Sequence, residues 1–229
     1  MATLSRMRVL STVLSQGLVP LFHHDDPEVA WSVLQAVAKG GGGVLEFTNR
    51  GDGAHEVFAE LQRRRRVELP EFALGVGTVR DAATAALYLN LGAEFVVGPS
   101  TEADVAGVCN RWKVPYLPGC ATLSEISRAE GLGCEIVKVF PGSAAGGPGF
   151  VAAALGPSPR SLLMPTGGVD VTEASLRSWF DAGVAAVGIG GKLISADLVA
   201  AEDWDGLADR VREVLATING LNATIREAL

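Results

Sequence analysis

Short apolar segments alternate with helical segments along almost the whole chain, and this alternation limits the possible folds more than any other feature. Runs of apolar and β-branched residues recur roughly every 20 to 30 residues, as expected of buried strands in a parallel sheet. Eight strands are predicted, at 18–22, 44–48, 73–79, 95–99, 115–119, 135–141, 162–165 and 185–189. Helical periodicity fills the segments between them, so we expect an α/β protein.

The predicted helices carry recognisable start signals. Asp25 or Asp26 precedes Pro27, and Asp81 opens another helical segment. Helices are predicted at about 3–16, 27–39, 52–66, 81–91, 102–112, 122–130, 150–155, 172–182 and 204–215. This order favours a closed (β/α)8 barrel, the TIM barrel, with an extra N-terminal helix. A doubly wound open sheet is the alternative, but no dinucleotide-binding glycine pattern follows the first strand.

The composition points to one domain spanning residues 1–229. With 229 residues, 48% of them hydrophobic, the chain can bury a large core without cross-links. The formal net charge of -7 leaves no basic surface for nucleic acid. Small anionic substrates would therefore be bound by local groups rather than by a general field.

Cysteine usage and the N-terminal region bear on the compartment. Cys109, Cys120 and Cys134 are odd in number and include no Cys-x-x-Cys pair, which argues against a disulfide framework or a structural zinc site. No small-residue cleavage site follows the apolar N-terminal segment, and no apolar run reaches the roughly 18 residues of a membrane span. We expect a cytoplasmic protein without a membrane segment.

Lys138 stands in the middle of the apolar strand at 135–141. Burying an ammonium group is costly unless it is paired, so a lysine in such a strand needs a reason. A neutral lysine amine is a nucleophile toward carbonyl carbon, and we interpret Lys138 as forming a Schiff base with a 2-oxo acid. The alternatives are an edge-strand lysine facing solvent, or a structural ion pair with Glu135 or Glu46.

Glu46 is predicted to share a cavity with Lys138. Side chains alternate along a strand, so an inward Lys138 leaves Val137 and Val139 on the outside, and an inward Glu46 does the same for Leu45 and Phe47. A carboxylate beside an amine suits general acid–base chemistry. A structural partner that neutralises Lys138 is the alternative role for Glu46.

Other polar residues follow the predicted strands at their carboxyl ends, where barrels place their chemistry. Arg50 offers a planar fork for a carboxylate, and Thr78 and Thr166 offer hydroxyl groups. Backbone N–H groups of two glycine pairs are candidates for binding phosphate. These pairs are Gly167 with Gly168 and Gly190 with Gly191, and each pair is also explained as a plain turn.

Two charged or titratable stretches are not expected to form a binding site. Arg63–Arg66 ends a predicted helix and is expected to be a solvated run. His23 and His24 follow the first strand, where a loop position is the preferred interpretation and substrate contact is the alternative.

With these residues in hand, the chain resembles the class I, Schiff-base family of 2-keto-3-deoxy-6-phosphogluconate and 4-hydroxy-2-oxoglutarate aldolases. The resemblance runs from Val19 to Ile194 and is specific only when its motifs are taken together. These motifs are Leu45-Glu46-Phe47-Thr48-Asn49-Arg50, Gly75-Val76-Gly77-Thr78-Val79, Val114-Pro115-Tyr116-Leu117-Pro118-Gly119, Lys138-Val139-Phe140-Pro141, Pro165-Thr166-Gly167-Gly168 and Gly188-Ile189-Gly190-Gly191.

The resemblance implies a homotrimeric barrel that cleaves its substrate to pyruvate and an aldehyde without metal or cofactor, as in the Entner–Doudoroff pathway. Lys138 matches the imine-forming lysine and Glu46 the acid–base residue. The positions that hold the pyruvate carboxylate or line the pocket are matched by Arg50, Thr78, Pro99, Phe140 and Thr166. The expected substrate is 2-dehydro-3-deoxy-6-phosphogluconate, giving glyceraldehyde 3-phosphate.

The chain departs from the family pattern at three positions. Gly142-Ser143 replaces a frequent Ala-Glu, Gly51 replaces a frequent threonine, and Lys192 stands where a phosphate-binding serine is usual. Lys192 either strengthens phosphate binding or favours a shorter, unphosphorylated substrate. Alternative activities are therefore cleavage of 4-hydroxy-2-oxoglutarate or of the galactose-series epimer. Outside the aldolases, a phosphosugar isomerase or epimerase and a non-catalytic barrel that binds a sugar acid are the other hypotheses.

Overall fold

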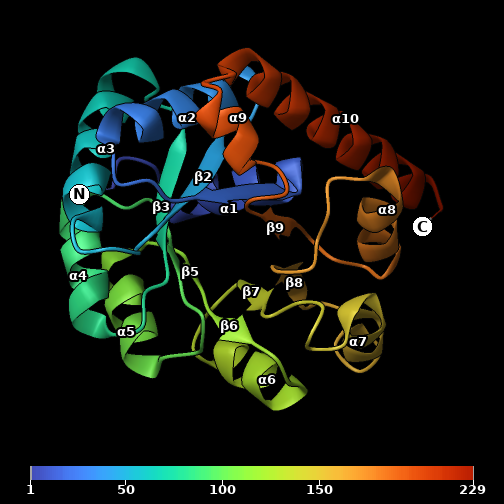
Figure 1. The fold of residues 1–229 in the computed structure, drawn as a ribbon. Helices are drawn as coiled ribbons and strands as arrows, with labels where there is room; N and C mark the ends of the chain where they lie inside the picture. The colour runs from blue at the N-terminus through green and yellow to red at the C-terminus, as the bar shows by residue number, and fades with distance from the viewer. Residues whose placement is uncertain (1, 229) are drawn as a thin grey trace.

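The structure of the protein is a computed structural model that describes residues 2–228, with the side chains of residues 2–221. Parallel strands lie in the middle and helices surround them (Figure 1). In chain order the elements are α1 Arg6–Gln16, β1 Leu18–Phe22, α2 Pro27–Lys39, β2 Val44–Thr48, α3 Ala54–Glu68, β3 Ala73–Gly77, α4 Ala82–Leu91, β4 Val96–Val97, α5 Ala103–Trp112, β5 Tyr116–Leu117, β6 Gly119–Cys120, α6 Leu123–Gly131, β7 Ile136–Val139, α7 Gly147–Leu155, β8 Leu162–Pro165, α8 Glu173–Asp181, β9 Val187–Ile189, α9 Ala196–Ala200 and α10 Trp204–Ala228.

The strands form a curved parallel sheet of the TIM-like α/β type. One part is a six-stranded sheet in the order β5-β4-β3-β2-β1-β9, and the other is a three-stranded sheet in the order β6-β7-β8. Neighbours in sequence are neighbours in the sheet because each helix returns the chain to the same side. The α/β class predicted from the sequence is therefore confirmed.

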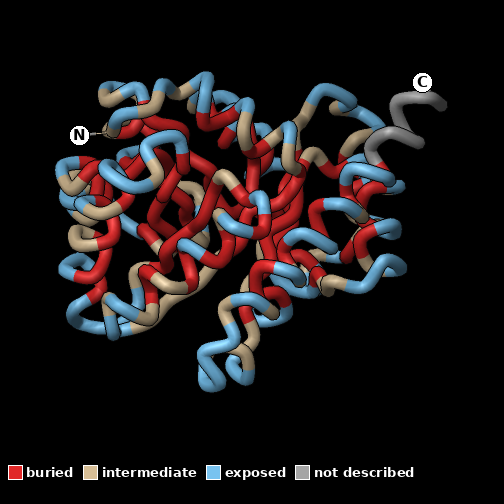
Figure 2. The backbone as a smooth tube through the Cα atoms, turned by 90° about the horizontal axis from the view of Figure 1, so that it is seen from above, coloured by how far each residue is buried: buried red, intermediate tan, exposed pale blue. Residues whose placement is uncertain are grey.

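Apolar side chains divide between the two faces of the sheet. An inner cluster on the concave face includes Val19, Val44, Ile136 and Met164, with one or more residues from most strands. An outer cluster packs the other face against the surrounding helices, and it includes Leu45, Phe47, Val137 and Val139. The buried parts of the backbone accordingly run through the middle of the molecule (Figure 2). The alternation predicted for the strands of Glu46 and Lys138 is confirmed.

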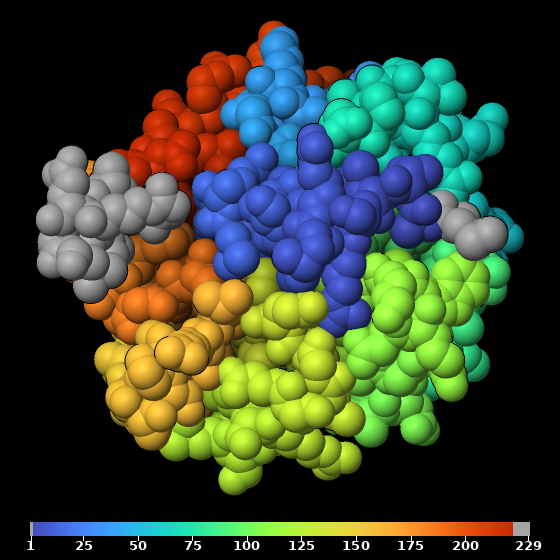
Figure 3. Space-filling view, turned by 180° about the vertical axis from the view of Figure 1, so that it is seen from behind, coloured from blue at the N-terminus to red at the C-terminus, as the bar shows by residue number. Residues whose placement is uncertain are grey.

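Helix α1 covers the amino-terminal end of the inner cluster. Val9, Leu10 and Val13 of this helix belong to that cluster. Figure 3 shows the molecule from behind, where the N-terminal segment crosses the middle of the face. The Ser5 side chain accepts a hydrogen bond from the Arg8 N–H, so the helix begins at Arg6 rather than near residue 3.

A buried ion pair ties the N-terminal segment to the sheet, and it corrects one prediction. Arg65 Nη2 lies 2.7 Å from Glu94 Oε1, and both side chains are fully buried. Glu94 also accepts hydrogen bonds from the N–H groups of Thr3 and Leu4. The prediction that Arg63–Arg66 is a solvated run is therefore wrong for Arg65, whose burial penalty is offset by this pairing.

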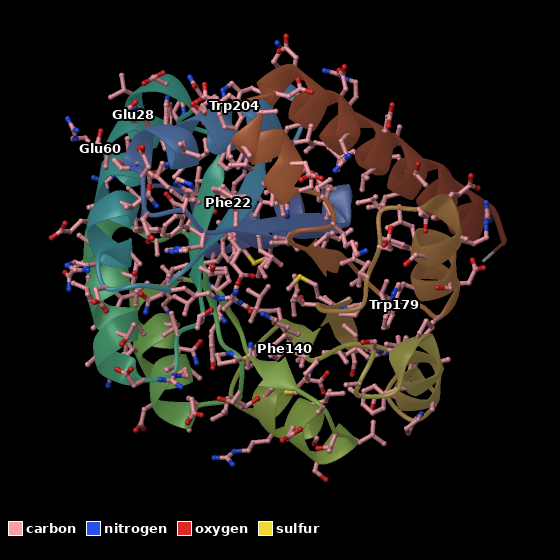
Figure 4. All side chains as sticks on the ribbon, viewed as in Figure 1. Phe22, Glu28, Glu60, Phe140, Trp179 and Trp204 are labelled. Carbon is pink, nitrogen blue, oxygen red and sulfur yellow. The ribbon has the colours of Figure 1, made fainter. Side chains whose placement is uncertain are left out.

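The neighbouring Arg64 has a different role at the surface. Its ion pair with Glu28 joins α3 to α2, and its ion pair with Glu60 lies within α3. Both glutamates lie near each other at the outside of the molecule (Figure 4).

The C-terminal helices differ most from the sequence prediction. Helix α10 runs from Trp204 to Ala228 instead of ending near residue 215, and it packs against α2 and α8. Helix α9 was not predicted, because five residues are too short to show helical periodicity. No helix in the described part of the chain combines the length and the apolar character that crossing a bilayer requires.

Candidate active site

Lys138 lies on β7, between β6 and β8 in its sheet. Its relative exposure is 5%, and its Nζ atom lies 4.8 Å from the centre of the Phe140 ring. Glu135 is paired with Arg6 instead, at 2.8 Å. Because β7 is not an edge strand, and no described carboxylate pairs with Lys138, both structural explanations of this lysine are wrong.

Glu46 is the buried carboxylate of the site. It lies on β2 with a relative exposure of 1%, and neither carboxylate oxygen has a hydrogen-bond partner. A Cβ atom placed on Gly77 of β3 would lie 1.8 Å from Glu46 Oε1. Only glycine at position 77 therefore leaves room for this side chain.

Thr166 repeats this arrangement at the end of β8. Its side chain is buried, and Oγ1 has no hydrogen-bond partner. A Cβ atom on Gly188 of β9 would lie 2.2 Å from Thr166 Oγ1. Buried polar atoms are normally hydrogen-bonded, so these unpartnered atoms indicate places for a ligand or water.

The backbone at Thr78 is strained. Thr78 directly follows β3 and has a φ of 63°. This left-handed conformation is unfavourable for a β-branched residue, and such strain is typical of functional sites. Pro99 and Phe140 are half-buried after β4 and β7. Figure 4 shows Phe140 near the end of β7, across the middle of the view from Phe22 on β1.

The two glycine pairs present free backbone donors. Among the described residues, no acceptor is bonded to the N–H groups of Gly167, Gly168, Gly190 or Gly191. Gly167 and Gly168 have φ values of 85° and 82°. The turn at Gly167 is tied to the loop after β7, because Ser143 N–H in that loop donates to Gly167 O at 3.0 Å. Unpaired N–H groups at the carboxyl end of parallel strands are suited to binding an anion.

Lys192 follows the second pair but is mostly exposed. Its Nζ atom lies 3.3 Å from Asp170 Oδ2. Although slight burial opposes ionisation, the Thr172 N–H and Lys192 together hold the pKa of Asp170 below its usual value. Lys192 therefore does not occupy the inner cavity.

Arg50 lies in the turn after β2, and its exposed side chain has no partner among the described residues. Asn49, next to it, was not singled out as a site residue from the sequence. Its Oδ1 accepts a hydrogen bond of 2.8 Å from the Tyr88 hydroxyl, and its N–H donates to Gly77 O. Asn49 therefore holds the turn in place, and this role is visible only in the folded structure, where α4 contacts the turn.

The predicted site residues thus come from most strands and gather at the carboxyl ends. Lys138 and Glu46 are buried on the concave side, while Arg50 and Lys192 lie at the exposed rim. In the described residues, no group of three or more His, Cys, Asp and Glu side chains is placed to hold a metal ion.

A curved parallel sheet with an unpaired buried lysine and a buried carboxylate defines the class of Schiff-base aldolases. The chain belongs to the KDPG and KHG aldolase family, whose model matches residues 9–210. The family resemblance found in the sequence is confirmed.

Individual relatives agree with this membership. The chain is 31% identical over 212 residues to a 2-dehydro-3-deoxy-phosphogluconate aldolase of Haemophilus influenzae, covering 92% of this chain and 97% of the relative. It is 30% identical over 206 residues to a KHG/KDPG aldolase of Escherichia coli, covering 89% and 93%.

Solved structures are similar over the same length. A KDPG aldolase of Legionella pneumophila, with pyruvate captured as a covalent carbinolamine intermediate, has a TM-score of 0.81 at 25% identity, covering 89% of this chain and 96% of that one. A 2-keto-3-deoxy-6-phosphogluconate aldolase of Zymomonas mobilis has a TM-score of 0.76 at 26% identity, covering 89% and 96%.

Proposed function

We propose that the protein is a class I aldolase that cleaves 2-dehydro-3-deoxy-6-phosphogluconate to pyruvate and glyceraldehyde 3-phosphate. The observation that carries this proposal is Lys138, buried without a counter-ion in the same concave face as the unpartnered carboxylate of Glu46. Family membership and the names of the relatives support the same reaction.

Lys138 and Glu46 divide the chemistry between a nucleophile and a proton carrier. The Lys138 amine attacks the C2 carbonyl, and the carbinolamine loses water to give a protonated imine. Glu46 moves protons in these steps and then takes the C4 hydroxyl proton. As the C3–C4 bond breaks, its electrons pass to the imine and leave an enamine and the aldehyde. Protonation at C3 and hydrolysis release pyruvate and regenerate Lys138.

The remaining site residues bind the two ends of the substrate. The Arg50 guanidinium is suited to the carboxylate of the 2-oxo acid, with Thr78 and Thr166 as hydroxyl donors nearby. Pro99 and Phe140 line the pocket.

The phosphate end is assigned to the glycine-rich rim. Four free N–H groups, from Gly167, Gly168, Gly190 and Gly191, can donate to phosphate oxygens, and Lys192 adds a positive charge. Lys192 is already paired with Asp170, so less of its positive charge is available to a phosphate group. This pairing favours 4-hydroxy-2-oxoglutarate as a second candidate substrate, because its distal carboxylate carries less negative charge than a phosphate. Both substrates are therefore to be assayed, beside the galactose-series epimer.

We infer that the two sheets form one closed eight-stranded barrel within a single domain spanning residues 1–229. Only Pro118 separates β5 from β6, and its carbonyl accepts a hydrogen bond from Lys138 N–H at 2.9 Å. On the other side, Thr166 pairs with Gly188, and Ala185 N–H donates to Leu163 O at 2.9 Å. These contacts support a continuous ladder from β7 through β8 to β9, with α1 as an additional N-terminal helix.

A homotrimer in the cytoplasm is proposed from the family resemblance. The three buried cysteines, none of them in a disulfide, support a reducing compartment. Light scattering of the full-length protein tests the trimer, and a monomeric mass would contradict it.

Trapping with pyruvate and borohydride tests the Schiff-base mechanism. Reduction of the imine is expected to add the pyruvate carbons irreversibly to Lys138, located by peptide mass spectrometry. Lys138→Ala is expected to form no adduct and to lose nearly all turnover, because no electron sink remains for the C3–C4 bond. Turnover close to wild type in that variant would refute the assignment. The isomerase, epimerase and non-catalytic hypotheses each predict no adduct.

A further inference from the structure

We propose that His23, oriented by Asp25, is a positioning residue for the turn that carries Arg50. Through that turn it sets the affinity of the site for the carboxylate end of the 2-oxo acid. This inference rests on the proposed function, because it takes Arg50 as the carboxylate-binding residue.

His23 lies in the loop after β1, against the strand that leads into the turn. Its ring centre is 5.4 Å from that of Phe47 on β2, at an interplanar angle of 53°. Its Nε2 atom lies 3.1 Å from Asp25 Oδ1, while 20% of the side chain remains exposed. The imidazole thus packs against Phe47 of β2, and its Nε2 atom is paired with the Asp25 carboxylate.

The same pair lies beside the backbone at Gly51, on the far side of the turn. Gly51, directly after Arg50, has a φ of 80°. A Cβ atom on Gly51 would lie 3.1 Å from Asp25 Oδ1 and 3.6 Å from His23 Nε2. The His23–Asp25 pair therefore lies beside the chain at both ends of the segment from Thr48 to Arg50.

The other side of the turn is held by different contacts. The Tyr88 hydroxyl donates to Asn49 Oδ1, and Asn49 N–H donates to Gly77 O at 2.8 Å. Arg50 itself contributes one backbone hydrogen bond, to Thr48 O at 2.9 Å, while its side chain has no described partner. The direction of the guanidinium therefore depends on the backbone of this turn, which His23 supports from the β1 side.

The Nδ1 atom of His23 indicates that this packing costs folding stability. It is buried and has no hydrogen-bond partner. A buried nitrogen without a partner lowers stability, and such costs are tolerated mainly where a local arrangement serves function. Among the described residues, the other side chains with such atoms are Glu46 and Thr166, both in the proposed site.

The test uses the aldol direction, in which pyruvate and the aldehyde have separate KM values. In His23→Ala, the KM for pyruvate is expected to rise about tenfold, because small displacements of a binding group are costly. The KM for glyceraldehyde 3-phosphate and kcat are expected to stay within about twofold of wild type, because Arg50 does not contact the aldehyde half or the reacting atoms.

Asp25→Asn provides a second variant that leaves the fold intact, since the Asp25 side chain is 85% exposed. It weakens the contact that orients His23, and a smaller rise in the same KM is expected. His24→Ala is the matched control, because the described contacts of His24 are a stack on Phe22 of β1 and a hydrogen bond from Asp26 N–H, and none of them involves the Arg50 turn. It is expected to leave the pyruvate KM unchanged.

Three outcomes would overturn the inference. They are an unchanged pyruvate KM in both His23→Ala and Asp25→Asn, an equal rise in both KM values, and the same rise in His24→Ala. If His23→Ala does not fold, the Asp25→Asn result decides alone. Failure of the proposed function looks different, because the wild-type protein would then form no pyruvate adduct and cleave no substrate.

Discussion

At the scale of single residues, glycines on neighbouring strands make the polar interior of the site possible. Glu46 and Thr166 each project into space that a side chain on the adjacent strand would fill, at Gly77 and Gly188. The Glu46 carboxylate is thus held by the shape of its surroundings rather than by hydrogen bonds. Such a carboxylate is free to exchange protons with a substrate.

Gly77→Ala is expected to displace Glu46 because the new methyl carbon would lie 1.8 Å from Oε1. General acid–base groups contribute about 10²- to 10⁴-fold to turnover, so kcat is expected to fall by roughly 100-fold or more. Steady-state cleavage assays measure this loss, and trapping at Lys138 is expected to persist at a lower rate.

Gly107→Ala is the control for this prediction, because a Cβ atom there meets nothing within 4 Å. Gly107 lies inside α5, where alanine is expected to keep or slightly raise stability. Turnover of Gly77→Ala close to that of Gly107→Ala would show that Glu46 is not held by this space.

The burial of Lys138 and Glu46 in the interior could be predicted from the sequence because charged residues inside apolar strands need an explanation. The roles of Gly77 and Gly188 could not, because they depend on the register between strands. The burial of Arg65 was missed for a related reason. Its partner, Glu94, lies 29 residues away along the chain.

At the scale of helices and strands, local signals predicted starts better than ends. Asp26 and Asp81 are N-caps whose side chains accept backbone hydrogen bonds, as their sequence context indicated. The strands β1, β2 and β8 match their predicted bounds, whereas others, such as β4 Val96–Val97, were predicted too long because the apolar run continues beyond the paired segment. Pairing between strands sets that limit, and periodicity does not show it.

The Asp81 cap gives a pH-dependent prediction for helix α4. Hydrogen bonds from the N–H and hydroxyl of Thr84 lower the pKa of Asp81. A lowered pKa in the folded state means that the contribution is present above the ordinary pKa of aspartate and is lost as the pH falls through the lowered value. Asp81→Ala is expected to cost about 1 kcal/mol near pH 7 and less near pH 3, by urea denaturation. An equal cost at both pH values would contradict this.

At the scale of the whole molecule, one core shields all the thiols. Burial raises the pKa of Cys109 and Cys134 to about 12 and that of Cys120 to about 11. The native protein at pH 8 is therefore expected to react negligibly with a disulfide reagent, because the thiolate is the reactive form. All three thiols are expected to react after denaturation. Rapid reaction of a thiol in the native protein would show that the core opens locally.

The position of α1 bears on how substrate enters the proposed site and how products leave it. Val9, Leu10 and Val13 close the amino-terminal end of the inner cluster, so we expect the proposed site to be reached from the loops after the strands. Substrate then enters, and pyruvate and the aldehyde leave, on the side of these loops. In the proposed mechanism the aldehyde is released first, because pyruvate stays bound to Lys138 until the imine is hydrolysed.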